Sequence, residues 1–330
     1  MMKKLLVLLM VLGMVVMFSN VGSAAPAAPV KIIKLGHIAP PEDPFNVLAT
    51  KFAELVAAKT SGQVKVEVFP GGQLGNDREQ IEAMRMGSQD MSIEGSINYE
   101  AFVPETAFVD LPFMFKDRQT AFKALDGPTS QQIWGTVIEK IGVRILVLPE
   151  NGFRQITTAK TPIKSLADLK GLKMRVPQTK LYMDTFKALG TLPTPITFTE
   201  LFTALQSGVV EGEENGMPLI YSSKFYEVQK FLAVTNHIYD AAPLAMSEKT
   251  WKSLTPDQQK AVQAAAIEAR DFQRKYVIAR EDDLIKKLQA AGMTFTYPAR
   301  DEFLKAVQPV IDGYKAKFGD AKFNKVLAGQ

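Results

Sequence analysis

Short apolar runs alternate with segments whose apolar residues recur every three or four positions through most of this chain. Residues 32–37 form a first apolar run, typical of a buried strand, and residues 44–59 place apolar side chains on one helical face. Valines alternate with polar residues over 63–69, which predicts a half-exposed strand. Asn76 or Asp77 is expected to cap the next helix. This order of strands and helices indicates an α/β fold.

A long helical pattern stands near the end of the chain, over residues 256–291. It contains no interior glycine or proline and is rich in Ala, Gln, Lys and Glu, which favour helices. At 1.5 Å per residue, such a helix would extend about 50 Å. A helix of that length can lie across two structural units and connect them.

Two α/β units are expected, because a chain of about 300 residues exceeds one typical hydrophobic core. We assign residues 26–150 to a first lobe, with about 240–280 returning to it. Residues 151–239 are assigned to a second lobe, together with about 281–330. The helix at about 256–291 is expected to bridge both lobes.

Residues 1–25 have the pattern of a signal peptide. Lys3 and Lys4 precede an uncharged apolar run, and small residues at 22–25 follow it. The run is shorter than the roughly 20 residues of a spanning helix, so a transmembrane anchor is the lesser alternative. The chain has no cysteine, which excludes a lipid anchor on cysteine, disulfides and thiolate metal sites. A chain that is exported and carries no anchor is expected to be located in the periplasm.

The charge and motif content argues against several other classes of protein. The formal net charge is +4, and removing Lys3 and Lys4 leaves +2 (4 − 2), with no basic run. We therefore expect no binding to nucleic acid. The sequence lacks a glycine-rich dinucleotide loop, a phosphate-binding loop, a nucleophile elbow and a zinc-helix motif. We expect neither enzyme activity nor a cofactor.

Metal binding has little support in the sequence. His37 and His237 are the only histidines, and without cysteine the usual transition-metal clusters cannot be assembled. An all-oxygen cation site from Glu94, Glu213 and Glu214 stays open, although no calcium-loop signature accompanies these residues. The prediction is that the protein holds no metal ion.

The segment from residue 151 to 215 carries the most informative polar residues. Arg154 and Arg175 each lie at the end of a short strand-like stretch, and Asn215 follows a third. A guanidinium at a strand end that faces a cleft can hold a carboxylate through two parallel hydrogen bonds. The pattern indicates a protein that binds a small organic acid.

Several blocks of the chain, taken in order, resemble a DctP-type solute-binding protein of a TRAP (tripartite ATP-independent periplasmic) transporter. They are FPGGQLGNDREQIEAMRMGSQDM, NGFRQITT, GLKMRVP with PTPITFTELFTALQSGVVEGEEN, and KFYEVQKFLAVTNH. The resemblance implies a two-lobed α/β periplasmic binding protein of the Venus-flytrap type, with a ligand cleft between the lobes and a long helix spanning both. Such proteins bind organic acids and deliver them to a membrane permease driven by an ion gradient.

The same resemblance assigns roles to particular residues. Arg175 matches the arginine that grips the carboxylate, and Arg154 matches a second arginine in the cleft. Asn215 matches a cleft asparagine, and Phe198 matches an aromatic residue that lines the pocket. From the residues alone, other roles stay open, namely a surface ion pair for either arginine, a helix cap for Asn215 and a core position for Phe198.

Glu94 and His37 complete the set of expected ligand-binding residues. In members of this family that bind sialic acid, the matching strand continues into a cleft glutamate and, three residues later, an arginine. Gly95 and Asn98 occupy those positions here, which argues against sialic acid, and Glu94 is expected to enter the pocket from the neighbouring position. His37 ends the first strand, where α/β sheets often present ligand contacts, although a buried structural histidine is equally consistent.

The leading hypothesis is a monomeric periplasmic protein that captures an organic acid and delivers it to TRAP membrane subunits. The alternatives are an exported enzyme acting on organic or sugar acids, and a capture protein that serves a signalling receptor. One arginine can bind the carboxylate of a C4-dicarboxylate, of a sugar acid, or of an aromatic or keto acid. The sequence therefore does not identify the acid.

Overall fold

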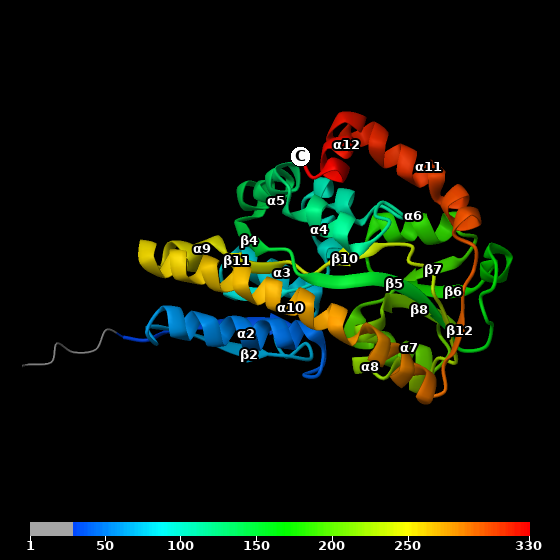
Figure 1. Ribbon diagram of the computed structural model, residues 1–330, viewed down its shortest axis with the longest axis horizontal. Coiled ribbons are helices and arrows are strands. Elements are labelled where there is room, and N and C mark those ends of the chain that lie inside the picture. Colours follow the sequence, from blue (N-terminus) through cyan, green and yellow to red (C-terminus); the bar gives the residue numbers. More distant parts are fainter. Residues whose placement is uncertain (1–28) are drawn as a thin grey trace, which may run out of the picture.

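The computed structural model describes residues 29–330 and contains two β-sheets surrounded by helices (Figure 1). Residues 1–28, which include the predicted signal peptide, lie outside the described residues. Within residues 29–330, no helix is both long and apolar enough to span a membrane. The protein therefore has the predicted α/β architecture, with two lobes that are each built on one sheet.

The sheet of the first lobe has the strand order β2-β1-β3-β11-β4. Its strands are β1 (Lys31–His37), β2 (Val64–Phe69), β3 (Met91–Ile93), β4 (Val143–Val147) and β11 (Leu244–Ser247). β1 is parallel to both β2 and β3, whereas β11 is antiparallel to β3 and β4. Because β1 and β3 are parallel, their carboxyl ends lie at the same edge of the sheet.

The sheet of the second lobe has the order β12-β9-β5-β8-β6-β7, and β10 pairs with β5 outside this path. Its strands are β5 (Glu150–Thr158), β6 (Lys173–Val176), β7 (Leu192–Pro195), β8 (Gly212–Gly216), β9 (Phe231–Ala233), β10 (Tyr239–Ala241) and β12 (Thr294–Thr296). β5 is the longest of them and runs antiparallel to β8. The central position of β5 explains why its side chains are buried almost throughout.

Helices cover both sheets. They are α2 (Pro44–Lys59), α3 (Asp77–Met86), α4 (Arg118–Asp126), α5 (Pro128–Ile141), α6 (Lys180–Ala188), α7 (Phe198–Gln206), α8 (Met217–Ser222), α9 (Glu248–Lys252), α10 (Pro256–Ala290), α11 (Arg300–Phe318) and α12 (Asp320–Ala328). Short 3₁₀ helices form η1 (Ser96–Tyr99), η2 (Pro104–Asp110), η3 (Leu166–Leu169) and η4 (Phe225–Glu227).

The N-terminal ends of α2 and α3 show how the sequence specifies these helices. The Asp43 side chain accepts a hydrogen bond from the Phe45 N–H and caps α2, with a proline in the first turn. Asn76 caps α3 and forms a reciprocal capping box with Glu79. The predicted cap at Asn76 is therefore confirmed, and it fixes the direction in which the start of α3 points.

The helix α10 lies across both lobes, as predicted, and crosses the centre of the molecule in Figure 1. It packs against α2 and β4 of the first lobe and against α8 and β5 of the second. Thr255 caps its start through a capping box with Gln258. Its 35 residues correspond to about 52 Å of helix.

The chain passes between the two sheets at three places. β4 leads into β5 through Leu148 and Pro149, β10 leads into β11 through Ala242 and Pro243, and α10 connects β11 and α9 with β12. The C-terminal helices also bridge the lobes, because α11 packs on α6 and α12 packs on α4 and α5. Two short connections and several helices thus hold the lobes together.

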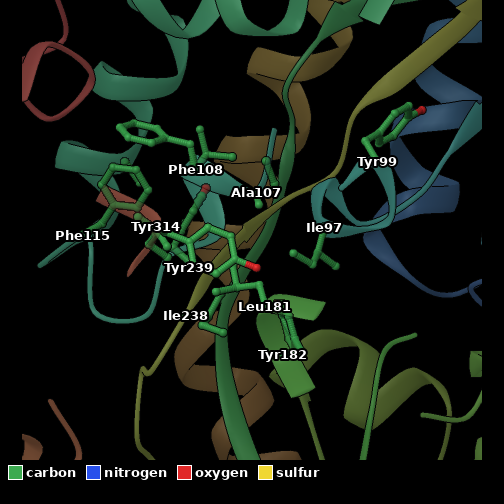
Figure 2. Packing of buried hydrophobic residues seen from close by; sticks show 14 of the residues in the cluster. Ile97, Tyr99, Ala107, Phe108, Phe115, Leu181, Tyr182, Ile238, Tyr239 and Tyr314 are labelled. Carbon is green, nitrogen blue, oxygen red and sulfur yellow. The ribbon is translucent and has the colours of Figure 1, made fainter. Parts of the chain in front are cut away.

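The largest hydrophobic cluster is continuous between the lobes. It contains Ile97 of η1 and Phe108 of η2 together with Tyr182 of α6 and Tyr239 of β10, all buried (Figure 2). A close-packed cluster of this kind resists small displacements of the elements that contribute to it. It forms the rigid support beside the pocket described next.

Candidate ligand-binding site

A pocket lies between the lobes, where elements of both sheets converge. It encloses about 710 Å³, counting solvent at its open side. The first lobe contributes Ile38, Phe45, Asn76, Asp77, Arg78, Gly95, Ile97, Asn98 and Ala101. The remaining lining residues, on or next to the strands of the second sheet, are Asn151, Arg154, Arg175, Pro177, Gln178, Thr179, Ile196, Thr197, Phe198, Asn215, Leu219 and Asp240. A cleft between two lobes in which a few polar groups converge is typical of a small-molecule site.

Arg175, the third of the four residues of β6, lines this pocket and is only 4% exposed. Its Nε donates a hydrogen bond to the Ile196 carbonyl oxygen at 2.8 Å. Within residues 29–330, no carboxylate lies within ion-pair distance of its guanidinium. Burial lowers the pKa of Arg175 from its ordinary value, with Glu214 acting in the opposite direction. The terminal nitrogens of this buried cation thus have donors to offer to an anion.

Arg154 lies in the middle of β5 and is also buried, but its charge is already paired. Its Nε and Nη2 bind the Glu214 carboxylate at 2.5 and 2.8 Å, and Nη1 binds Asp240 Oδ2 at 2.8 Å. Nη2 also donates to the Glu214 carbonyl oxygen. Although burial opposes the charge, Glu214 and Asp240 raise the pKa of Arg154 well above its ordinary value. The guanidinium is therefore held in a fixed orientation beside the pocket.

Asn215 and Phe198 also reach the pocket, from β8 and from the first residue of α7. Asn215 is buried inside the strand, and Gly216 rather than Asn215 caps α8, so a capping role for Asn215 is not observed. Its Nδ2 donates to Glu213 Oε2 at 2.8 Å, which leaves the amide oxygen for another partner. Phe198 is partly buried and packs with its ring near Phe225. The structure thus brings Arg154, Arg175, Phe198 and Asn215 together.

Glu94 and His37 are not among the pocket-lining residues. Side chains alternate between the faces of a strand, and Gly95 and Ile38, the next residues along, line the pocket instead. Glu94 is fully buried and accepts a hydrogen bond from the Tyr99 hydroxyl at 3.0 Å. His37 is fully buried too, and its Nε2 lies 3.3 Å from Asn46 Oδ1. Both residues belong to the packing behind the pocket.

Asp77 adds a negative group on the wall formed by the first lobe. It lies in the first turn of α3, where the Asn76 cap directs it toward the pocket. Burial raises the pKa of Asp77 to about 6, while Arg175 acts to lower it. The pocket therefore has a cationic side at Arg175 and an acceptor side at Asp77.

Asp240 and Asn151 are site residues that the sequence pattern did not single out. Asn151 Nδ2 donates to Asp240 Oδ2 at 2.7 Å, and both residues line the pocket. They are 89 positions apart, and only the antiparallel pairing of β10 with β5 brings them together. The start of the block NGFRQITT was the available signal for Asn151, whereas Asp240 had none beyond its place in a strand-like run.

Gly95 and Asn98, the two residues that argued against sialic acid in the sequence, both line the pocket. A Cβ atom at residue 95 would lie 3.1 Å from Asp240 Oδ2, so a larger side chain would crowd that carboxylate. Asn98 Nδ2 donates to the Gly95 carbonyl oxygen at 3.2 Å. At these two positions the wall therefore presents hydrogen-bonding groups and no charged side chain.

The structure does not form the cation site that the sequence left open for Glu94, Glu213 and Glu214. Glu214 pairs with Arg154, Glu213 accepts bonds from Thr157 and Asn215, and Glu94 is bonded to Tyr99. Across residues 29–330, no group of three or more histidine, aspartate or glutamate side chains has the geometry to hold a metal ion.

Two α/β lobes around a polar pocket with a buried, unpaired arginine define the class of solute-binding proteins with a cleft between lobes. Residues 35–317 match the family described as bacterial extracellular solute-binding protein, family 7, or DctP. The chain belongs to this family of TRAP periplasmic solute-binding proteins.

Two solved structures are similar over nearly their full length. A TRAP periplasmic solute-binding protein from Polaromonas sp. JS666, bound to D-erythronate, has a TM-score of 0.88 and 39% identity, covering 90% of this chain and 98% of that one. The sugar acid binding protein DctPAm from Advenella mimigardefordensis strain DPN7T, in complex with galactonate, has a TM-score of 0.88 and 33% identity, covering 91% and 98%. The 2,3-diketo-L-gulonate-binding periplasmic protein YiaO of Escherichia coli K12 is 32% identical over 89% of this chain and 85% of its own.

Proposed function

We propose that this protein binds a sugar acid through an ion pair between Arg175 and the ligand carboxylate, and delivers it to TRAP membrane subunits in the periplasm. The observation that carries the proposal is the buried guanidinium of Arg175, which has one backbone acceptor and no carboxylate partner among the described residues. A buried charge is costly unless it is paired. An anionic ligand supplies the missing partner.

The remaining polar groups suit a ligand that also carries hydroxyl groups. Asp77 is an acceptor, and the amides of Asn98, Asn215 and Gln178 offer both donors and acceptors. A second carboxylate on the ligand would approach Asp77 and meet a like charge. A hydroxylated monocarboxylate is therefore favoured over a C4-dicarboxylate, which agrees with the sugar acids bound by the similar structures.

The delivery step rests on the family and on the expected export of the chain. We propose that residues 1–25 direct export and are removed, and that the protein acts as a monomeric carrier. His37 and Glu94 support the pocket from behind and do not touch the ligand. A carrier must return its ligand chemically unchanged, which separates this function from that of an exported enzyme.

The test is calorimetric titration of the purified protein, refolded after removal of any bound acid, with D-erythronate, galactonate and succinate. We expect a sugar acid to bind and to be recovered unchanged by mass spectrometry, and succinate to bind far more weakly. Arg175→Ala is expected to cost about 2–5 kcal/mol of binding free energy, the range for losing one member of a buried charge pair. Arg144→Ala, which removes a partly buried arginine paired with Glu248 away from the pocket, is the matched control.

The stability of the ligand-free protein provides a second readout. Because Arg175 has no paired carboxylate, Arg175→Ala is expected to change the free energy of unfolding by less than about 1 kcal/mol. Arg154→Ala leaves two buried carboxylates unpaired and is expected to cost about 3–5 kcal/mol. If Arg175→Ala bound the same acid as tightly as wild type, or if the acid were converted, the proposal would be wrong.

A further inference from the structure

Two buried carboxylates beside the pocket contact the same hydroxyl group. Ser96 Oγ lies 2.6 Å from Asp110 Oδ1 and 2.9 Å from Asp240 Oδ1. All three residues are at most 1% exposed. They come from three separate elements, since Ser96 begins η1, Asp110 ends η2 and Asp240 lies in β10.

Few hydrogens are available for the two contacts that link Asp110, Ser96 and Asp240. A serine hydroxyl carries one hydrogen and can donate it to only one carboxylate. The Ala241 N–H donates to Ser96 Oγ at 3.3 Å, so the oxygen also acts as an acceptor. The second short contact between oxygens therefore requires a proton on one of the two carboxyl groups.

The surroundings of Asp240 identify it as the ionised partner. Its Oδ2 accepts from Arg154 Nη1 at 2.8 Å and from Asn151 Nδ2 at 2.7 Å. Its Oδ1 accepts from the Ser96 N–H at 3.1 Å in addition to the hydroxyl. Burial raises the pKa of Asp240, whereas Arg154, Asn151 and Ser96 act to lower it. A carboxylate that accepts several donors, one of them cationic, is stabilised in its charged form relative to a carboxylate that lacks them.

Asp110 has the opposite surroundings. Its Oδ2 is buried and has no hydrogen-bond partner among the described residues. Burial and the nearby charge of Asp240 raise its pKa well above the ordinary value, and Glu100 acts in the same direction, whereas the contact with Ser96 and the charge of Arg154 oppose them.

The other charged and titratable groups near η2 do not neutralise Asp110. Lys140 of α5 binds Glu105 near the opposite end of η2, and Tyr314 of α11 donates its hydroxyl hydrogen to Glu100. Tyr182 of α6 has a buried hydroxyl without a partner in residues 29–330. Residues close in sequence to Ser96, Asp110 and Asp240 are apolar and buried, since Ile97, Ala107, Phe108 and Tyr239 belong to the cluster in Figure 2.

We propose that Asp110 is a protonated carboxylic acid at neutral pH and serves as a positioning residue for the ligand site. The Asp110 O–H donates to Ser96 Oγ, and the Ser96 O–H donates to Asp240. Because both hydrogen bonds are donated toward Asp240, this carboxyl group stays ionised. Asp240 in turn holds Arg154 and Asn151 at the pocket wall. The effect on ligand affinity rests on the proposed function, whereas the protonation of Asp110 does not.

The first test needs no ligand. Infrared spectra of the wild-type protein and of Asp110→Asn, both labelled with ¹³C at the aspartate side-chain carboxyl, are compared at pH 8. At this pH Asp43 and Asp77, whose pKa values are both about 6, are ionised. We expect a protonated-carboxyl band in the wild type that shifts with the label and is absent from Asp110→Asn. Absence of that band from the wild type overturns the proposal.

The second test compares the same substitution, aspartate to asparagine, at the two carboxyl groups that contact Ser96. An asparagine amide can donate to Ser96 as a protonated acid does, so Asp110→Asn is expected to retain affinity for D-erythronate or galactonate within about threefold. Asp240→Asn removes a required charge and is expected to weaken binding at least about tenfold, and Ser96→Ala should do the same.

The outcomes separate this inference from the function itself. If Asp110→Asn weakens binding as much as Asp240→Asn, Asp110 acts as a carboxylate and the inference is wrong. If neither acid binds the wild type, the proposed function fails, and the infrared band still decides the protonation of Asp110. Should Asp110→Ala fold, weak binding by it and rescue in Asp110→Asn would support a donor at this position.

Discussion

Arg154 and Arg175 are residues of the same type, buried to nearly the same degree, that have different tasks. Arg154 has two carboxylate partners and holds the pocket wall in shape. Arg175 has a single backbone acceptor and keeps donors available. The sequence block predicted that both arginines face the cleft, but their partners Glu214 and Asp240 could not be assigned without the strand pairing.

Glu94 does not line the pocket, and its burial affects the stability of the protein through the pKa of its carboxyl group. Burial raises its pKa to about 8 from 4.5, with Asp77 acting in the same direction and the Tyr99 hydrogen bond opposing. Folding therefore retains a proton that the unfolded chain releases. The stabilising contribution is fully present below about pH 4.5 and is lost as the pH rises to about 8.

We expect Glu94→Gln to flatten the pH dependence of stability in this window. An amide cannot ionise but can accept the Tyr99 hydrogen bond, so the wild type loses up to about 1.4 kcal/mol per pH unit that the variant keeps. Urea unfolding at pH 5, 6, 7 and 8 measures the difference. Glu105→Gln is the control, because Lys140 lowers the pKa of Glu105 and its titration lies below this window. Parallel curves for wild type and Glu94→Gln would contradict the assignment.

At the scale of elements, the strongly periodic and capped segments were predictable. α2 begins and ends at the predicted residues, and α10 ends one residue earlier than predicted. Their signals are local, namely an apolar face, a capping residue and a proline in the first turn. Residues 96–110 gave no comparable signal, because η1 and η2 are short and mostly buried and their conformation depends on tertiary packing.

The junction between β8 and α8 depends on a glycine. A Cβ atom on Gly216 would lie 2.7 Å from the Asn151 carbonyl oxygen, which is backbone and cannot easily move. This close approach places the end of β8 beside the first half of β5, where Asn151 and Arg154 face the pocket.

Gly216→Ala is accordingly expected to lower the free energy of unfolding by about 1–3 kcal/mol and to weaken ligand binding. Gly313→Ala is the matched control, since nothing lies within 4 Å of its added Cβ in the exposed interior of α11. That control should raise stability by about 1 kcal/mol, because alanine favours a helix more than glycine does. Equal effects in denaturant unfolding would show that the contact with Asn151 does not matter.

At the scale of the whole molecule, α10 is hydrogen-bonded directly to the first residue of β5, where the chain enters the second lobe. Gln273 of α10 accepts from the Glu150 N–H at 3.1 Å and donates to the Glu150 carbonyl oxygen at 2.6 Å. The sequence predicted the helix and its length, but a single glutamine inside a long helix gives no sign of this contact.

Gln273→Ala should lower the free energy of unfolding by about 2 kcal/mol or more, because two buried backbone groups lose their partners. Gln263→Ala removes one comparable bond, to the Leu146 carbonyl oxygen, and is expected to cost less. Thermal or urea unfolding of both variants measures the difference. A smaller loss for Gln273→Ala than for Gln263→Ala would argue against the role of this contact.

The three passages between the sheets also determine where the pocket can open. No residue of α10 lines it, whereas Arg78, Ala101 and Gln178 are lining residues exposed to solvent, the first two on one lobe and the third on the other. If the lobes rotate about their connections, separation is greatest at the rim formed by these three residues. Under the proposed function, the acid would then enter with its carboxylate leading toward Arg175, and its opposite end would remain nearest this rim. A bulky substituent at that end would hold the rim apart, so such derivatives should bind the open form and act as competitive blockers of uptake.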